Sequence, residues 1–86
     1  KEMDLQVALT STNISQTLTG IKRLAAEYSG VINDIDIQQD EEGGQKVYRL
    51  SLKIEIEKKL KKEEYANFVA RLTEFSDITR VKVEEF

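Results

Sequence analysis

Apolar and polar residues follow two rhythms along the chain, one repeating every second residue and the other every third to fourth. Strand side chains point to opposite faces in turn, whereas one face of a helix recurs every three to four residues. Residues 3–10 have the first rhythm and predict a strand, with Met3, Leu5, Val7 and Leu9 on its buried side. Residues 14–28 have the second and predict a helix, whose apolar stripe comprises Ile14, Leu18, Ile21, Leu24, Ala25 and Tyr28.

Polar residues mark both ends of this predicted helix. Thr10, Ser11 and Thr12 are turn and cap residues that separate it from the strand. Asn13 is followed three positions later by Gln16, a pair typical of a capping box at a helix start. Gly30 predicts the end of the helix, because glycine readily adopts the left-handed conformation that closes many helices.

The middle of the chain predicts a β-hairpin. Alternation over residues 31–38 places Asp34, Asp36 and Gln38 on one face and Val31, Asn33, Ile35 and Ile37 on the other. The acidic, glycine-containing segment Asp40–Gln45 is typical of a hairpin turn. The strand that follows, over residues 47–57, alternates most regularly, with Tyr48, Leu50, Leu52, Ile54 and Ile56 on one face.

A second helix and a last strand complete the pattern. The charged segment 58–64 leads into the helix, whose stripe comprises Tyr65, Phe68, Val69, Leu72 and Phe75. Ser76 and Asp77 break the helical rhythm. Ile78, Val81 and Val83 then predict a final strand that runs toward Phe86.

These six elements predict an α+β fold, the ferredoxin-like βαββαβ sandwich. Two helices on one face of a four-stranded antiparallel sheet bury both apolar stripes at once. We expect the strand order 4-1-3-2, with strands 1 and 3 central. The other sheet face is mostly polar, and is either solvated or a modest interface; it carries Ala8, Asp34, Asp36, Val47, Ser51, Lys53 and Glu55.

Length and charge narrow the class of protein. The 86 residues amount to one domain, 1–86, with a single core. The formal net charge of −3 argues against nucleic acid as a partner, because such binding needs a strongly basic surface. The chain starts at Lys1 without a methionine and has no apolar run of bilayer length. We therefore expect a fragment of a longer protein, with any membrane anchor in the missing part.

The residue types present argue against catalysis. The chain lacks histidine, cysteine and tryptophan, which excludes Ser-His-Asp triads, Cys-His pairs and zinc sites built from those ligands. A group of carboxylates could offer oxygen ligands to a cation, but its spacing is not that of a calcium loop. This group is Asp34, Asp36, Asp40, Glu41 and Glu42. We expect these residues to be solvated, and we predict a protein that is not an enzyme and holds no metal or cofactor.

The loop after the first strand has two interpretations. Thr10, Ser11, Thr12 and Asn13 place hydroxyl and amide groups beside the free N–H groups of a helix start. Such a setting can hold a small carboxylate or amide ligand, so these four residues are the candidate ligand-binding site. Simple helix capping explains the same residues.

The lysine-rich run before the second helix also has two interpretations. Lys58, Lys59, Lys61 and Lys62 could meet an anionic membrane surface or a phosphate ligand. Glutamates flank the run on both sides and offset its charge, which favours a solvated loop. These are Glu55, Glu57, Glu63 and Glu64.

Several segments together resemble an ACT-type domain. They are the apolar strand Leu5–Leu9, the helix end Tyr28–Ile32, the acidic hairpin and the final strand Ile78–Val83. The resemblance covers nearly the whole chain and implies the sensing of a small molecule such as an amino acid. ACT domains usually carry an aspartate and a glycine after the first strand, and Thr10 and Asn13 stand near those positions here.

Within that group, the chain is similar to the C-terminal cytosolic domain of MgtC/SapB-type membrane proteins. The similarity lies in the hairpin Asp40–Gln45, the strand Tyr48–Glu57 and the closing strand Ile78–Glu84. It implies an accessory or regulatory role beside a membrane domain linked to magnesium and virulence physiology. It implies no metal site in this domain.

Two functions are expected on these grounds. The first is a non-catalytic, cytoplasmic regulatory or interaction domain that forms a homodimer through a sheet edge or the helix face. The alternative is the amino-acid-sensing domain of a soluble metabolic enzyme or regulator, with its ligand near Thr10–Asn13. The first predicts dimerisation without ligand, and the second predicts a thermal shift with one amino acid.

Overall fold

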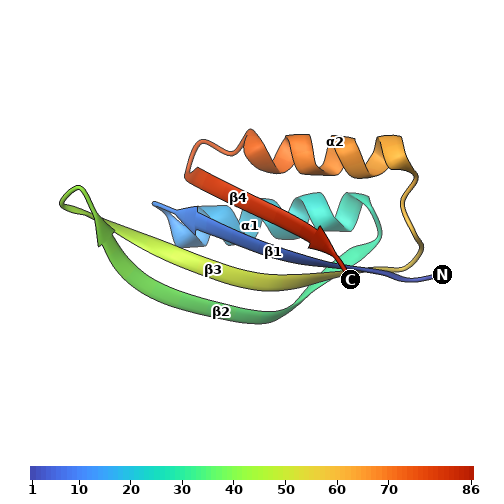
Figure 1. Cartoon of the computed structure of the whole chain (residues 1–86), viewed down its shortest axis with the longest axis horizontal. Helices are drawn as coiled ribbons and strands as arrows, with labels where there is room; N and C mark the ends of the chain where they lie inside the picture. The colour runs from blue at the N-terminus through green and yellow to red at the C-terminus, as the bar shows by residue number, and fades with distance from the viewer.

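The computed structural model describes all residues from 1 to 86 and contains the six predicted elements (Figure 1). Their order along the chain is βαββαβ, as predicted. The elements are β1 (Met3–Ser11), α1 (Ile14–Glu27), β2 (Gly30–Glu42), β3 (Gln45–Ile56), α2 (Lys62–Thr73) and β4 (Ile78–Glu85).

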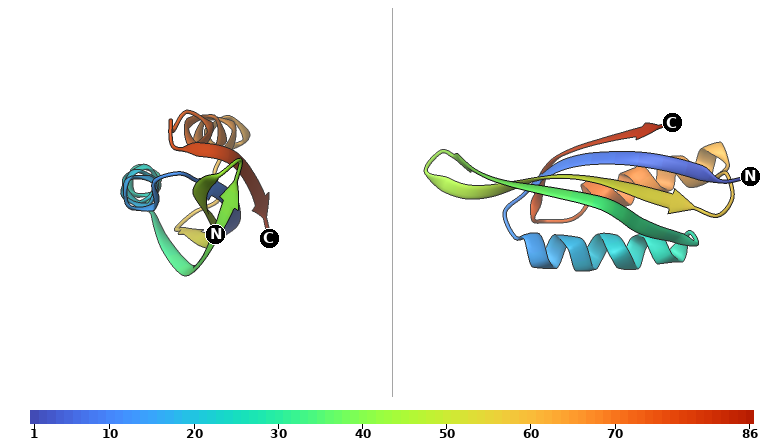
Figure 2. Two further views of the ribbon diagram at one scale, coloured as in Figure 1. Left: turned by 90° about the vertical axis from the view of Figure 1, so that its left-hand side faces the viewer. Right: turned by 90° about the horizontal axis from the view of Figure 1, so that it is seen from below.

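The four strands form one antiparallel sheet in the order β2-β3-β1-β4. This is the predicted order 4-1-3-2 counted from the other edge, so the ferredoxin-like prediction is confirmed. Figure 2 shows both helices on the same side of a curved sheet. The other face of the sheet therefore has no helix over it.

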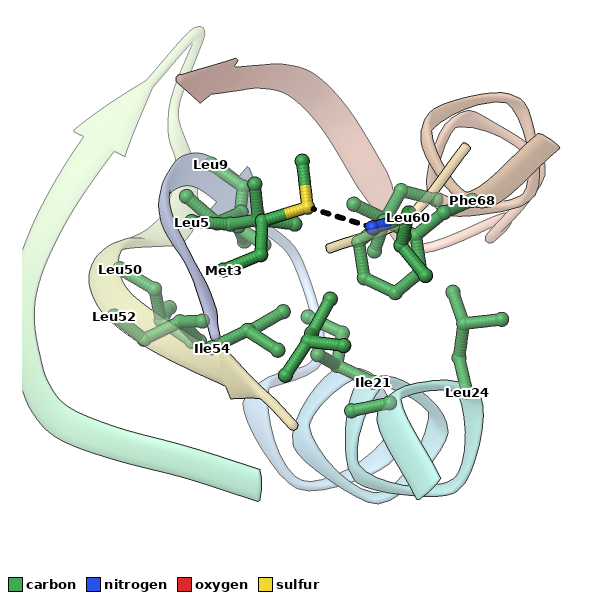
Figure 3. Close-up of a cluster of buried hydrophobic side chains, with 14 residues drawn as sticks. Met3, Leu5, Leu9, Ile21, Leu24, Leu50, Leu52, Ile54, Leu60 and Phe68 are labelled. Atoms are coloured by element: carbon green, nitrogen blue, oxygen red, sulfur yellow. Dashed lines mark hydrogen bonds between the residues drawn. The ribbon is translucent and has the colours of Figure 1, made fainter. Parts of the chain in front are cut away.

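The core lies between the helices and the central strands β1 and β3 (Figure 3). The register sets Leu5 beside Ile54 and Val7 beside Leu52, so the inward residues of both strands form one apolar surface. From the helices, Ile21, Leu24, Phe68 and Leu72 close over it. The period-two pattern of both strands therefore predicted the core correctly.

The prediction of one unbroken alternation along β2 is wrong, because this strand contains a bulge. Asn33 faces Lys53 and Asp36 faces Ser51, so two residues of β2 stand opposite the single residue between them on β3. An extra residue exchanges the two faces of a strand from that point on. Asp34, at the bulge, has a positive φ of 54°.

The exchange of faces changes the surroundings of the isoleucines. Before the bulge, Ile32 lies beside Ile54 and Val31 beside Glu55; after it, Ile37 lies beside Leu50. Val31 and Ile37 are therefore on opposite faces, not on the common face that alternation predicts.

The predicted left-handed closure of α1 at Gly30 is also wrong. Ser29 has the positive φ, 59°, and Gly30 is already the first residue of β2. A glycine is needed at position 30 for another reason. A Cβ atom there would lie 3.2 Å from the Ala25 carbonyl oxygen and 3.3 Å from Ile54 Cγ2. Gly30 thus lets the chain leave α1 close against the core.

The β2–β3 hairpin ends in a two-residue turn at Gly43 and Gly44, with φ values of 57° and 79°. Positive φ at both positions is the requirement of a type I′ turn, which matches the twist of the strands. The turn is shorter than the predicted segment Asp40–Gln45, because β2 continues to Glu42. In Figure 1 the hairpin reaches the end of the molecule opposite both termini.

Candidate functional site

The four residues of the predicted ligand loop lie at the junction of β1 and α1. Thr10 and Ser11 are the last residues of β1 and are buried. Thr12 is half-buried, and Asn13 is the N-cap of α1. The four residues are consecutive in the chain, but the first two lie in the interior and the last is exposed at the start of α1.

Hydrogen bonds within the chain occupy most polar groups of this loop. Ser11 Oγ lies 2.7 Å from Thr17 Oγ1 and accepts the N–H of Asn13 at 3.0 Å. The Thr12 N–H donates to the Asp77 carbonyl at 2.9 Å. Asn13 Oδ1 accepts the N–H of Gln16 at 3.1 Å. The predicted helix cap is confirmed, whereas ligand binding at this loop stays a prediction.

Thr17 is a buried polar residue that the sequence reasoning missed. It is 2 % exposed and its hydroxyl meets that of Ser11 in the interior. Thr17, Ile21 and Leu24 recur at helical spacing, and that spacing was the available signal. A threonine at a stripe position is easily counted as polar, although it can be buried when its hydroxyl has a partner.

A polar groove of about 670 Å³ runs beside the loop, between the first half of α1 and the segment before β4. Of the four predicted residues, only Asn13 lines it. Arg23 and Asp77 also line it, with one apolar residue, Phe75. The groove offers groups of both charges and several hydroxyls.

A second, apolar groove of about 420 Å³ lies between α1 and the edge strand β2. We call this groove the α1–β2 surface. Two of its side chains are unusually exposed for their type: Val31 is 60 % exposed and Ile35 47 %. The groove is lined by Leu18, Lys22, Ala26, Gly30, Val31, Ile32 and Ile35.

The acidic residues of the hairpin bind arginine rather than gather at one point. Arg49 Nε donates to Asp40 Oδ2 at 2.9 Å, and Arg49 Nη2 donates to Glu42 Oε2 at 2.8 Å. A backbone N–H, that of Glu41, and the Arg49 guanidinium both hold the pKa of Asp40 below its ordinary value. No group of three or more carboxylates is positioned to hold a metal ion.

The lysine-rich run is a loop held in place by its one apolar residue. Leu60 is buried in the core, and its N–H donates to Met3 Sδ at 3.4 Å (Figure 3). The lysines on either side of Leu60 are exposed. Lys59 Nζ lies 3.4 Å from Glu85 Oε2 at the end of β4.

An ion pair and an aromatic pair connect the two helices. Arg71 of α2 donates to both carboxylate oxygens of Glu27 on α1, at 2.6 and 2.9 Å. These hydrogen bonds lower the pKa of Glu27 and raise that of Arg71. Beneath them, the rings of Tyr28 and Phe68 meet edge to face, with centroids 5.2 Å apart.

Neither helix has the length and apolar character that a bilayer crossing needs.

No protein-family model matches the chain, and no curated protein sequence matches it either. Solved structures do match, and they define the class of fold as ACT-like. The ACT domain of a GTP pyrophosphokinase from Chlorobium tepidum has a TM-score of 0.61 and 10% identity, over 98% of this chain and 100% of that one.

The C-terminal domain of the MgtC protein from Mycobacterium tuberculosis has a TM-score of 0.71. The match covers 98% of this chain and 87% of that one, at 9% identity. The chain therefore has the ACT-like fold of the MgtC C-terminal domain, and the resemblance predicted from the sequence is confirmed at the level of the fold.

A de novo designed protein, Foldit4, also shares the fold. Its TM-score is 0.57 at 12% identity, over 100% of this chain and 97% of that one. A fold that is also reached by design specifies no activity by itself, so the function has to be argued from the surfaces of this chain.

Proposed function

We propose that this chain is a non-catalytic regulatory domain that acts by association with a second copy through the α1–β2 surface. The observation that carries the proposal is the exposure of Val31 and Ile35, which line an apolar groove. Apolar side chains gathered at a groove mark interaction sites, whereas single exposed ones need no explanation.

The shape of β2 favours association through side chains over extension of the sheet. β2 is an edge strand, so one row of its backbone groups has no partner. The bulge at Asp34 interrupts that row, and bulges are a common protection against strand addition. The groove can take up apolar side chains of a second copy, and this contact needs no continuous row of backbone hydrogen bonds between strands. A twofold arrangement would place Val31 or Ile35 of each copy in the groove of the other.

The fold further supports a role like that of the MgtC C-terminal domain. In this proposal the chain is the cytosolic accessory domain of an MgtC/SapB-type membrane protein linked to magnesium physiology. Association of two such domains would then bring two membrane domains together. Membrane contact would come only through the rest of the parent protein.

Analytical ultracentrifugation tests the association. We expect a concentration-dependent dimer, and we expect Ile35→Asp to shift the chain to monomer, because a carboxylate in an apolar contact is left unpaired. Phe86→Asp is the matched control, since it also replaces an exposed apolar residue, 71 % exposed, but away from the groove, with its ring centroid 5.9 Å from Lys53 Nζ. A wild-type chain that stays monomeric at millimolar concentration would refute the proposal.

The second candidate is a small-molecule sensor of the ACT kind. The polar groove beside Asn13 favours it, because Arg23 and Asp77 could bind the carboxylate and ammonium groups of an amino acid. A ligand at 100 times its dissociation constant adds about 2.7 kcal/mol of stability. A thermal-shift screen of amino acids, with Arg23→Gln as the comparison, tests this candidate. An unchanged melting temperature across the panel would remove it.

A further inference from the structure

The face of the sheet that no helix covers has a hollow of about 370 Å³ lined by residues of all four strands. The register explains it. Ala8 lies between Ser51 and Lys82, and Thr10 lies between Arg49 and Arg80. The central strand thus supplies two small side chains as a floor, and its neighbours supply long cationic side chains as a rim.

Thr10 is only 4 % exposed on this open face. The two arginines on either side of it belong to different strands, and both pair with the same acidic residue of the hairpin. Arg49 Nη2 lies 2.8 Å from Glu42 Oε2, and Arg80 Nη1 lies 3.6 Å from the same oxygen atom. Two guanidinium groups from the lining of the hollow therefore converge on a single carboxylate oxygen.

The side chains that line the hollow favour an anionic occupant. Three cationic side chains line it, Arg49, Arg80 and Lys82, against one carboxylate, that of Asp36. An anion there competes with carboxylates outside the lining, because Asp40 and Glu42 pair with Arg49 and Glu84 lies 3.8 Å from Lys82. Planar guanidinium groups bind the oxygens of phosphates and carboxylates through paired hydrogen bonds. Glu42 is the last residue of β2 and adjoins the Gly43-Gly44 turn, so its position depends on the hairpin.

We propose that this hollow binds a phosphate monoester of a small molecule, and that Glu42 occupies the anion position when the ligand is absent. The phosphate oxygens take the place of Glu42 Oε2 between Arg49 and Arg80, and the organic part lies over Ala8 and Ser51. The volume is at the lower end of the range for small-molecule sites. Binding would free the end of the β2–β3 hairpin from β4.

A phosphate titration followed by NMR tests the proposal. Inorganic phosphate is added to the full chain at constant ionic strength, with sodium chloride as the reference, and backbone amide shifts are recorded. We expect saturable shifts at Ala8, Thr10, Ser51 and the neighbouring residues of β4. We expect weaker binding in Arg80→Gln, which removes one of the two converging guanidinium groups.

A substitution of Glu42, whose carboxylate competes with phosphate for the two arginines, gives a more specific test. Glu42→Gln should tighten phosphate binding about fivefold, the effect of removing one like charge at about 4 Å in water. Glu41→Gln is the matched control, because it removes the same charge from an exposed neighbour that makes no ion pair with either arginine. Binding that tightens equally in both variants would overturn the assigned site. So would shifts confined to the lysine-rich loop.

Discussion

Two residues other than glycine adopt a left-handed backbone, and each lies where the chain changes direction. Ser29 does so between α1 and β2, and Asp34 does so at the bulge of β2. A side chain in this conformation costs roughly 1–2 kcal/mol, because Cβ crowds the following carbonyl oxygen. At the scale of single residues, glycine therefore occurs at position 30, where space is short, whereas the preceding position, where φ is positive, is a serine.

Ser29→Gly should raise the free energy of unfolding by about 1 kcal/mol, because glycine adopts positive φ without strain. Ser29 is exposed and its side chain forms no hydrogen bond in the structure, so little is lost with it. Urea denaturation measures the change. A variant less stable than the wild type would show that the Ser29 side chain has a role beyond its backbone conformation.

Gly30→Ala should lower the free energy of unfolding by about 1–3 kcal/mol, the usual effect of overpacking. The added Cβ would lie 3.2 Å from a backbone oxygen, which cannot move aside as a flexible side chain can. The same denaturation experiment compares this variant with Ser29→Gly. Equal stability of Gly30→Ala and the wild type would mean that the start of β2 relaxes outward at no cost.

At the scale of elements, the residue rhythms identified all six helices and strands but not the direction of every side chain. β1 and β3 are central and regular, so their alternation predicted which residues are buried. β2 lies at an edge, where one extra residue costs few contacts, and its bulge places Val31 and Ile37 on opposite faces. Nothing in a run of alternating isoleucine and aspartate marks the point at which a bulge occurs.

The candidate sites also differ in how far they could be predicted from the sequence, because some depend on neighbouring residues and others on distant elements. The cap at Asn13 depends on residues three positions apart, so the sequence was sufficient to predict it. The α1–β2 surface and the pairing of Glu42 with Arg80 depend on how distant elements meet. The spacing of apolar residues along the chain does not tell how far apart distant elements lie in space. Both features were therefore found only in the structure.

The ion pair between the helices should make stability depend on pH. Glu27 has a folded-state pKa below its ordinary 4.5 because of its hydrogen bonds with Arg71. The contribution of the pair is therefore present above about pH 4.5 and is lost as the pH falls through the lower folded-state pKa. Thermal denaturation of Arg71→Gln and the wild type should differ slightly at pH 7, since both side chains are exposed, and should converge near pH 3. A difference that persists at pH 3 would contradict this cause.

At the scale of the whole molecule, one core supports every element. Leu52 is fully buried on the central strand β3, and the apolar cluster to which it belongs includes residues of β1 and both helices. A chain of this length buries only about 60% of its unfolded surface. The sheet, the helices and the surfaces that they form should therefore be lost together in one transition.

Leu52→Ala should lower the free energy of unfolding by about 2–5 kcal/mol, a large part of the 5–15 kcal/mol typical of a domain. Val31→Ala is the matched control, since Val31 is 60 % exposed on β2 and its truncation leaves no cavity. Circular dichroism during urea denaturation measures both. A Leu52→Ala effect no larger than that of Val31→Ala would place the stabilising core elsewhere.

The strand order also affects how the chain reaches this structure during translation. β1 is synthesised before the other elements of the domain, yet it lies between β3 and β4: Met3 pairs with Ile56, and Leu5 pairs with Glu85. Such long-range pairings form slowly, whereas the β2–β3 hairpin closes locally. The nascent domain therefore exposes the apolar side of β1 until β3 has emerged. In that interval α1 is the element of this domain that can cover the apolar side of β1 and protect it from aggregation.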